Sequence, residues 1–181
     1  MRKSFYDESD RTLVQDCLAG DEQAQQTLYE QYAQAMYNVA VRMVNRSADA
    51  EDILQEVFVK VFRNLHTFQG DSTIGAWIKR ITVNSTLNFI RSQKNYQIVE
   101  VSEAWNPPLE ETETEVSAYN MTDIHYAIKQ LPERCRAIVS LYLIEGYQHK
   151  EIAQILDITE STSKTQYRRG RQLLQDLLRR R

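Results

Sequence analysis

Helix-breaking residues are scarce in this chain, and their positions limit what it can fold into. The 181 residues include only three prolines and five glycines, and Pro107 and Pro108 are adjacent. Because proline interrupts helices and glycine weakens them, the stretches on either side of this pair are free to be helical. Apolar side chains recur in both stretches at three- and four-residue spacings, which is typical of helices with one buried face. The sequence therefore predicts an all-α protein with two small helical domains joined by a flexible acidic linker.

Three long helices are predicted in the first domain, which we place at residues 1–95. They span, in order, residues 21–43, 47–65 and 72–91. Ser72 is expected to cap the third helix, because a serine side chain before a helix can accept a hydrogen bond from a backbone N–H of the first helical turn. Trp77 is expected to be buried in the stripe that this helix turns toward the core.

Charge is distributed unevenly along the chain, although the net charge is only −3. Residues 67–95 carry four basic side chains and one acidic, residues 96–123 carry seven acidic and none basic, and residues 124–181 carry eleven basic and six acidic. The linker, placed at residues 96–120, also lacks any helical or strand period, which is typical of a disordered tether. Two basic blocks separated by an acidic segment indicate two surfaces that bind polyanions, although solvated helix faces would give the same counts.

The last part of the chain, residues 121–181, has the pattern of a helix-turn-helix domain. Helices are predicted at residues 121–130, 132–146 and 148–156, and from residue 160 to the basic end. The last two are separated by a turn that ends at Thr159, which is expected to cap the final helix. The small and apolar side chains of that helix fall on one face. Its outer surface then carries the residues that can reach bases and phosphates, namely Lys164, Thr165, Arg168, Arg169 and Arg171.

A second polar surface is predicted on the helix at residues 72–91. Arg80, Asn84, Leu87 and Arg91 recur at spacings of four, three and four, which indicates one helical face. Lys79 and Lys94 flank this face and aromatic residues lie near it, a combination that suits single-stranded DNA because exposed bases stack on aromatic rings. The residues expected to contact an opened strand are Asn64, Lys79, Arg80, Asn84 and Arg91.

Four segments carry a resemblance to a known family: residues 49–58, residues 74–84, residues 131–134 and the helix-turn-helix. In this order they are similar to segments of bacterial extracytoplasmic-function (ECF) sigma factors, the small two-domain initiation subunits of RNA polymerase. The resemblance extends from about Asp21 to Arg180. It implies a specificity subunit with no catalytic residues and no cofactor.

The resemblance also implies a role for each part of the chain. Residues 1–95 would be region two, which opens and reads the minus-ten promoter element, and residues 121–181 would be region four, which reads the minus-thirty-five element. The five residues expected to contact an opened strand would bind the minus-ten element. The five residues on the outer surface of the final helix would bind the minus-thirty-five element. Docking on the beta-prime clamp helices of core RNA polymerase is implied for Asp52, Gln55, Glu56 and Val59. The beta flap of the polymerase and an anti-sigma factor are further implied partners, and the linker would thread through the polymerase.

Four positions differ from the usual pattern of the family. Asn88 stands where aspartate is frequent, which bears on the base preference at the minus-ten element. Asp157 stands where glycine is common, Ser163 where valine is common, and Gly170 where alanine is common. Aspartate tolerates the left-handed conformation of a turn better than most residues, so the turn is expected to form. Gly170 lowers the helix propensity by up to about 1 kcal/mol, and Ser163 weakens the apolar contact between the helices.

Three other functions fit parts of the sequence. A one-component regulator would use the helix-turn-helix alone and would bind duplex DNA tightly without polymerase. An interaction module would occupy polymerase without reading DNA, and the basic side chains Lys164, Arg168 and Arg169 count against it. An enzyme is disfavoured, because the three histidines are scattered and the sequence has no glycine-rich phosphate loop and no metal-binding histidine pair.

The cellular compartment follows from what the sequence lacks. Cys17 and Cys135 lie far apart, which supports neither a disulfide framework nor a cysteine zinc site. No apolar run approaches the roughly 18 residues of a membrane span, and the first residues lack the apolar segment of a secretory signal. We expect a cytoplasmic protein without a membrane span.

Overall fold

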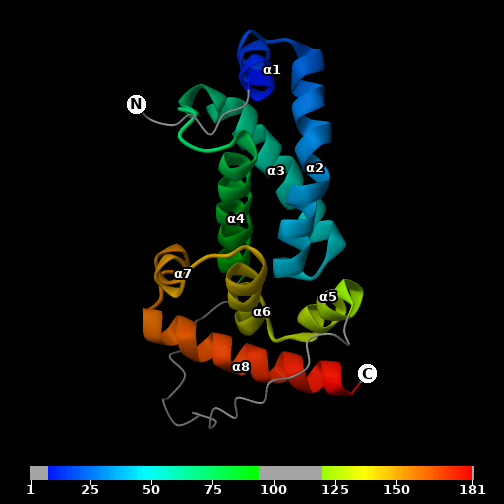
Figure 1. The fold of residues 1–181 in the computed structure, drawn as a ribbon, viewed down its shortest axis with the longest axis vertical. Coiled ribbons are helices and arrows are strands. Elements are labelled where there is room, and N and C mark those ends of the chain that lie inside the picture. Colours follow the sequence, from blue (N-terminus) through cyan, green and yellow to red (C-terminus); the bar gives the residue numbers. More distant parts are fainter. Residues whose placement is uncertain (1–7, 94–119, 181) are drawn as a thin grey trace. The chain divides into compact units, whose positions relative to one another are not determined.

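A computed structural model describes residues 8–93 and 120–180, and all its regular elements are helical (Figure 1). The chain divides after Ile90 into two compact units. The first half contains α1 (Glu8–Leu18), α2 (Glu22–Val44), α3 (Ser47–Asn64), the short turn η1 (Leu65–Thr67) and α4 (Ile74–Ser92). The second contains α5 (Met121–Gln130), α6 (Glu133–Val139), η3 (Ser140–Ile144), α7 (His149–Leu156) and α8 (Glu160–Arg179). The predicted all-α fold with two helical domains is confirmed, whereas residues 96–119 of the predicted linker lie outside the described residues.

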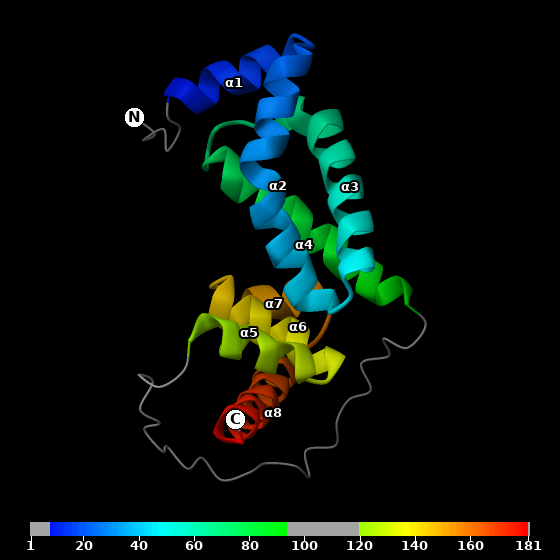
Figure 2. The same cartoon turned by 90° about the vertical axis from the view of Figure 1, so that its right-hand side faces the viewer.

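In the first unit, α3 runs back along α2, and α4 crosses both helices (Figures 1 and 2). Asp21 caps α2 by accepting a hydrogen bond of 2.8 Å from the backbone N–H of Gln23. Asn45 ends the helix in the left-handed conformation, with φ of 72°. The pattern at residues 21–43 therefore predicted this helix correctly, because strong caps and a regular apolar stripe agree.

The helix α1 is absent from the sequence prediction. It buries Val14 and Cys17, each 5% exposed, against the rest of the unit. It has only 11 residues, and its apolar positions are confined to its second half, so its amphipathic pattern is short. The helix is stabilised by tertiary packing, which cannot be predicted from the local sequence.

The start of α4 differs from the prediction by one residue. Thr73, and not Ser72, caps the helix, since its Oγ1 accepts a hydrogen bond of 3.2 Å from the backbone N–H of Ala76. Trp77 is only half-buried, whereas the sequence predicted that it is buried. Its ring lies against that of Phe68, with centroids 5.6 Å apart. The two rings pack on each other beside the turn that precedes α4, which leaves part of the indole at the surface.

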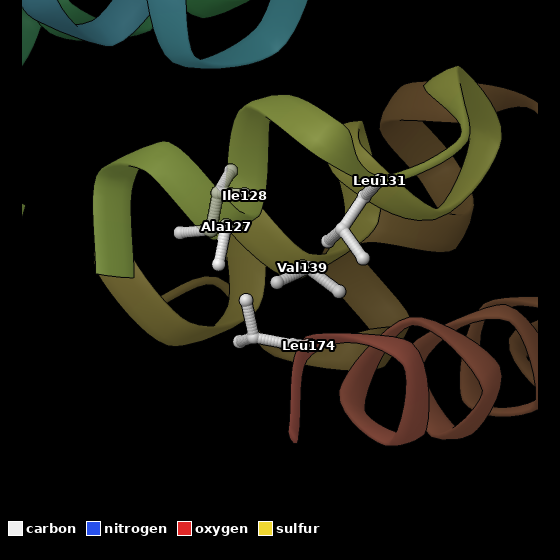
Figure 3. Packing of buried hydrophobic residues seen from close by; sticks show 5 residues of the cluster. All are labelled: Ala127, Ile128, Leu131, Val139 and Leu174. Carbon is white, nitrogen blue, oxygen red and sulfur yellow. The ribbon is translucent and has the colours of Figure 1, made fainter. Parts of the chain in front are cut away.

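The second unit has a small apolar core at which α5, α6 and α8 meet. Figure 3 shows its buried side chains, which are Ala127, Ile128, Leu131, Val139 and Leu174. The sequence predicted Pro132 in the first turn of a helix, but in the structure Pro132 is the cap residue that precedes α6. The helix expected at residues 132–146 is instead α6 followed by the π-helical turn η3, and it stops at Gly146, where φ is 78°.

The helix-turn-helix consists of α7, a tight turn and α8. Asp157 adopts the expected left-handed conformation, with φ of 54° and ψ of 49°. Thr159 caps α8, as predicted, because its Oγ1 accepts a hydrogen bond of 3.0 Å from the N–H of Thr162. At the start of α7, the N–H of Gln148 donates a hydrogen bond of 2.7 Å to the carboxylate of Glu151. Both helices are thus fixed at their N-terminal ends.

Gly170 lies where α8 crosses α6. A Cβ atom added there would stand 2.5 Å from Cγ2 of Val139 and 3.1 Å from Cβ of Cys135. Carbon atoms in ordinary contact are about 3.5 to 4.0 Å apart, so a larger residue does not fit without movement. The glycine that lowers the helix propensity therefore allows the two helices to approach closely.

Candidate functional site

The outer surface of α8 carries the predicted basic residues. Lys164, Arg168, Arg169 and Arg171 are exposed, and Thr165 is half-buried. The ammonium group of Lys164 forms an ion pair with Glu160, at 2.6 Å, one helical turn earlier. The buried face of the same helix includes Ser163 and Gly170, as predicted. One helix therefore presents several cations on the side that does not pack into the core.

A cluster centred on His149 joins α7 to α8. Its Nδ1 is 2.9 Å from Oγ of Ser163, and its ring stacks on Tyr142 with centroids 4.4 Å apart and meets the edge of Tyr167 at 5.3 Å. Burial, with the nearby charge of Lys164 second, lowers the pKa of His149 below its ordinary value. The imidazole is therefore neutral at pH 7 and supports the α8 surface through packing and one hydrogen bond.

Two residues of this support were not predicted. His149 is one of three histidines that are scattered in the sequence, and Gln166 belongs to none of the predicted site residues. Gln166 is 4% exposed, and its side-chain oxygen accepts a hydrogen bond from Sγ of Cys135, at 3.4 Å. No local spacing indicates these contacts, because Tyr142 is in η3 and His149 begins α7, on either side of the break at Gly146.

The predicted docking residues share one exposed face of α3. Asp52, Gln55, Glu56 and Val59 are all exposed, and the side chain of Val59 is 66% exposed. The opposite face of the helix is buried in the first unit and consists of Ala50, Ile53, Leu54, Val57, Phe58 and Val61. The result is a mainly acidic and polar surface with one apolar side chain, which suits a basic protein partner.

The polar face of α4 is present, but its composition differs from the prediction. Arg80, Asn84 and Arg91 are exposed, and Lys79 is half-buried. Leu87 is 1% exposed, so its assignment to this face was wrong: spacing alone placed an apolar residue among polar ones, and burial removes it from water. Asn88 is exposed and continues the four-residue spacing from Asn84. Lys94, which was expected to flank the face, lies outside the described residues.

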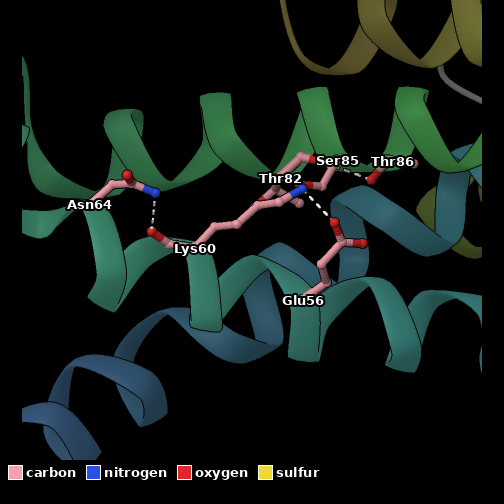
Figure 4. Close-up of polar contacts among 6 residues, drawn as sticks. All are labelled: Glu56, Lys60, Asn64, Thr82, Ser85 and Thr86. Carbon is pink, nitrogen blue, oxygen red and sulfur yellow. Dashed lines mark hydrogen bonds and ion pairs between the residues drawn. The ribbon is translucent and has the colours of Figure 1, made fainter.

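Between α3 and α4, Lys60 forms a bridge that was not predicted from the sequence (Figure 4). Its ammonium group pairs with Glu56 on α3 and donates a hydrogen bond of 3.0 Å to Oγ of Ser85 on α4. Asn64, one turn further along α3, donates a hydrogen bond of 2.8 Å from its side chain to the carbonyl oxygen of Lys60. Asn64, a predicted minus-ten contact, and Glu56, a predicted docking residue, are thus both bound to one lysine. The spacing of four between Glu56 and Lys60 was the available signal.

The described residues contain no group of three or more histidine, cysteine, aspartate or glutamate side chains that could hold a metal ion. In the same residues, no helix combines the length and apolar character that crossing a bilayer requires.

Comparison with known proteins agrees with this arrangement. Residues 28–96 match the family model of sigma-70 region 2, and residues 121–174 match that of sigma-70 region 4. The ECF RNA polymerase sigma factor SigE of Mycolicibacterium smegmatis is 33% identical over 179 residues, which are 95% of this chain and 69% of that protein. The chain belongs to the ECF sigma factors of RNA polymerase. The RNA polymerase sigma-H factor of Pseudomonas aeruginosa is 30% identical over 182 residues, or 94% of each chain.

A solved structure has the same fold. The sigma factor RpoE of Bartonella quintana, crystallised with the anti-sigma factor NepR, aligns with a TM-score of 0.54 over 85% of this chain and 96% of that one, at 21% identity. Family membership confirms the function expected from the resemblance, which is that of a sigma factor in transcription initiation. Its known relatives are sigma factors and not enzymes, and a one-component regulator would leave the match to region 2 unexplained.

Proposed function

We propose that this sigma factor binds core RNA polymerase through the exposed face of α3 and directs it to promoters through α4 and α8. In this proposal residues 1–95 form the functional region two and residues 121–181 the functional region four. Residues 96–120 connect the two on the polymerase. The protein acts in the cytoplasm, where the polymerase is.

The observation that carries the proposal is the surface of α8. Its exposed cations, Lys164, Arg168, Arg169 and Arg171, are on the second helix of a capped helix-turn-helix. A helix of this kind enters the major groove, where arginine pairs with guanine and lysine with phosphate. We assign these residues, with Thr165, to the minus-thirty-five element.

The face of α4 supports the second contact with the promoter. Arg80 and Arg91 would hold phosphates of the non-template strand, and Asn64 and Asn84 would bond to an extruded base, at an unstacking cost of a few kcal/mol. Lys79 adds positive charge beside them. The ring pair of Phe68 and Trp77 is at the start of the same helix and offers a surface on which a base can stack. We assign this face to the minus-ten element and to strand opening.

The partners on the protein side follow from the charge of the α3 face. Asp52, Glu56, Gln55 and Val59 would contact the beta-prime clamp helices, with the carboxylates facing basic groups of the polymerase. The second unit would contact the beta flap. An anti-sigma factor is a further proposed partner, supported by the likeness to a sigma factor that was crystallised with one.

Runoff transcription tests the proposal. Purified core polymerase and this chain would be incubated with a library of genomic fragments, and the transcripts sequenced. We expect discrete start sites that need this chain, with shared motifs near minus ten and minus thirty-five. The variant Arg168→Ala with Arg169→Ala serves as the control, because it should still bind core polymerase but lose these start sites. Tight binding to duplex DNA without polymerase, and no transcript with it, would instead identify a one-component regulator.

A further inference from the structure

Lys60 has more bonding capacity than the contacts within the first unit use. An ammonium group has three N–H donors, and Glu56 and Ser85 account for two of them. The side chain of Lys60 is 37% exposed, and that of Glu56 is 52% exposed. Ser85 is 2% exposed. The ammonium group therefore lies at the boundary between the exposed face of α3 and the buried side of α4. Lys60 can therefore bind one more acceptor from solution without leaving Ser85.

The two partners of Lys60 differ in what they do to its charge. Glu56 neutralises the ammonium group, whereas the hydroxyl of Ser85 only positions it. The neighbouring hydroxyls on α4 have other acceptors: Oγ1 of Thr82 donates to the carbonyl of Ile78 at 3.0 Å, and Oγ1 of Thr86 to the carbonyl of Thr82 at 2.8 Å. Loss of Glu56 would thus leave a cation held at a fixed point of α4 by a neutral group (Figure 4).

That fixed point adjoins the face assigned to the minus-ten element. Ser85 follows Asn84 in α4, and Asn64 is bonded to the backbone of Lys60 itself at 2.8 Å. A single strand that follows Asn64 and Asn84 would therefore bring its phosphates near Lys60. Glu56, in contrast, belongs to the face assigned to the polymerase. One carboxylate would have to serve both a basic partner protein and Lys60, and it cannot neutralise both fully.

We propose that Lys60 is a contact for a phosphate of single-stranded DNA, which Glu56 masks in the free chain and which polymerase docking unmasks. When a basic group of the polymerase binds the carboxylate of Glu56, the ammonium group stays on Ser85 and takes a phosphate oxygen in place of the carboxylate. The role of the polymerase rests on the proposed function, because it requires Glu56 to be a docking residue. The masking itself is a property of the free chain and can be measured without polymerase.

The test measures binding of the full-length chain to a fluorescent single-stranded oligonucleotide of mixed sequence, by anisotropy at several salt concentrations. Glu56→Gln removes the masking charge. Glu51→Gln is the matched control, because Glu51 is exposed on the same helix and no ion pair of its carboxylate occurs among the described residues. Lys60→Met removes the cation but keeps the apolar stem, and Lys60→Arg restores a cation. Circular dichroism of each variant checks that the fold is intact.

We expect Glu56→Gln to tighten binding by about threefold to tenfold at low salt and to steepen the salt dependence by roughly 0.7, the value for one added phosphate on a single strand. Glu51→Gln should change the affinity by less than about twofold, since it removes the same charge without freeing a cation. In the Lys60→Met background, Glu56→Gln should behave like Glu51→Gln, and in the Lys60→Arg background the gain should return.

Equal effects of Glu56→Gln and Glu51→Gln would overturn the proposal, as would a gain that persists with Lys60→Met, or no binding by Glu56→Gln. A second measurement separates this result from the proposed function. Wild-type and Lys60→Met chains should bind core polymerase equally, and Lys60→Met holoenzyme should bind promoter DNA more weakly and with a shallower salt dependence. If neither chain binds the polymerase, the proposed function fails although masking in the free chain stands.

Discussion

Replacing Gly170 by alanine tests whether α8 must approach α6 closely. It also tests whether this close approach positions the basic surface of α8. The added Cβ would stand 2.5 Å from Cγ2 of Val139, about 1 Å closer than an ordinary contact. Val139 is fully buried, and a valine in a helix has one strongly preferred rotamer, so it cannot turn away at little cost. Either α8 must shift or the contact must be strained.

Two opposing effects set the magnitude. Overpacking a buried contact costs about 1 to 3 kcal/mol, and replacing glycine by alanine within a helix recovers about 0.8 to 1 kcal/mol. The net loss in the free energy of unfolding is therefore about 1 kcal/mol. In a Val139→Ala background the clashing methyl group is gone, and the remaining close neighbour, Cβ of Cys135 at 3.1 Å, needs a shift of only a few tenths of an ångström. There Gly170→Ala should stabilise by about 1 kcal/mol.

Native-state amide hydrogen exchange of α8 in the full chain is the assay, because it reports the second unit separately from the first. Val139→Ala is itself destabilising, since it leaves a cavity, and the double-mutant cycle removes that cost. The expected coupling between the two sites is about 2 kcal/mol, well above the roughly 0.5 kcal/mol scatter of independent sites. If Gly170→Ala has the same effect in both backgrounds, the close approach of the helices does not explain the glycine.

Four further outcomes are expected. Burial and Lys164 lower the pKa of His149 below its ordinary 6.5, so the second unit should keep its full stability above pH 6.5 and lose some as the pH falls through the lowered pKa, and His149→Phe should flatten this dependence in hydrogen exchange. Arg168→Ala and Arg169→Ala should each weaken promoter binding by the holoenzyme by about 1 to 3 kcal/mol, whereas Arg179→Ala, near the end of the same helix, should not. Asp52→Lys with Glu56→Lys should prevent copurification with core polymerase, since like charges repel, and a wild-type yield would contradict the assigned docking face. Arg80→Ala with Asn84→Ala should give closed complexes that lack permanganate-reactive thymines at the minus-ten element, and normal reactivity would exclude this face from strand opening.

Periodicity and caps predicted much of the fold because they act within one helix. The helix at 21–43, the left-handed Asp157 and the cap at Thr159 depend on residues a few positions apart, and all three were predicted correctly. The first helix, Glu8–Leu18, was missed because its apolar pattern is short and its stability comes from packing on other helices. Leu87 was misplaced for a related reason, since spacing gives the angle around a helix but not what covers it.

The supporting contacts of the candidate sites were the least predictable part. Ser163, His149 and Tyr142 come together from three separate elements, and the bridge from Lys60 to Ser85 spans 25 positions. A local pattern carries no signal for contacts of this kind, because they depend on how helices pack and not on the period of any one helix. The exposed residues that face DNA or polymerase were easier to name, since they are the polar positions left over once the buried stripe is known.

Gly170 connects the packing of the helices to the exposed residues that face DNA. Its double-mutant cycle therefore has a functional outcome as well. If the glycine serves to make α8 flexible, alanine should stiffen the helix and change promoter binding equally with or without Val139. If it serves close approach, alanine should displace α8 only when Val139 is present, and the exposed arginines on the other side of the helix should move with it. Promoter affinity of the Gly170→Ala holoenzyme should then fall and should recover in the double variant, because a displacement of about 1 Å is enough to misalign bidentate contacts. Recovery of stability without recovery of promoter affinity would show that the spacing of α6 and α8 supports the fold but does not position the arginines.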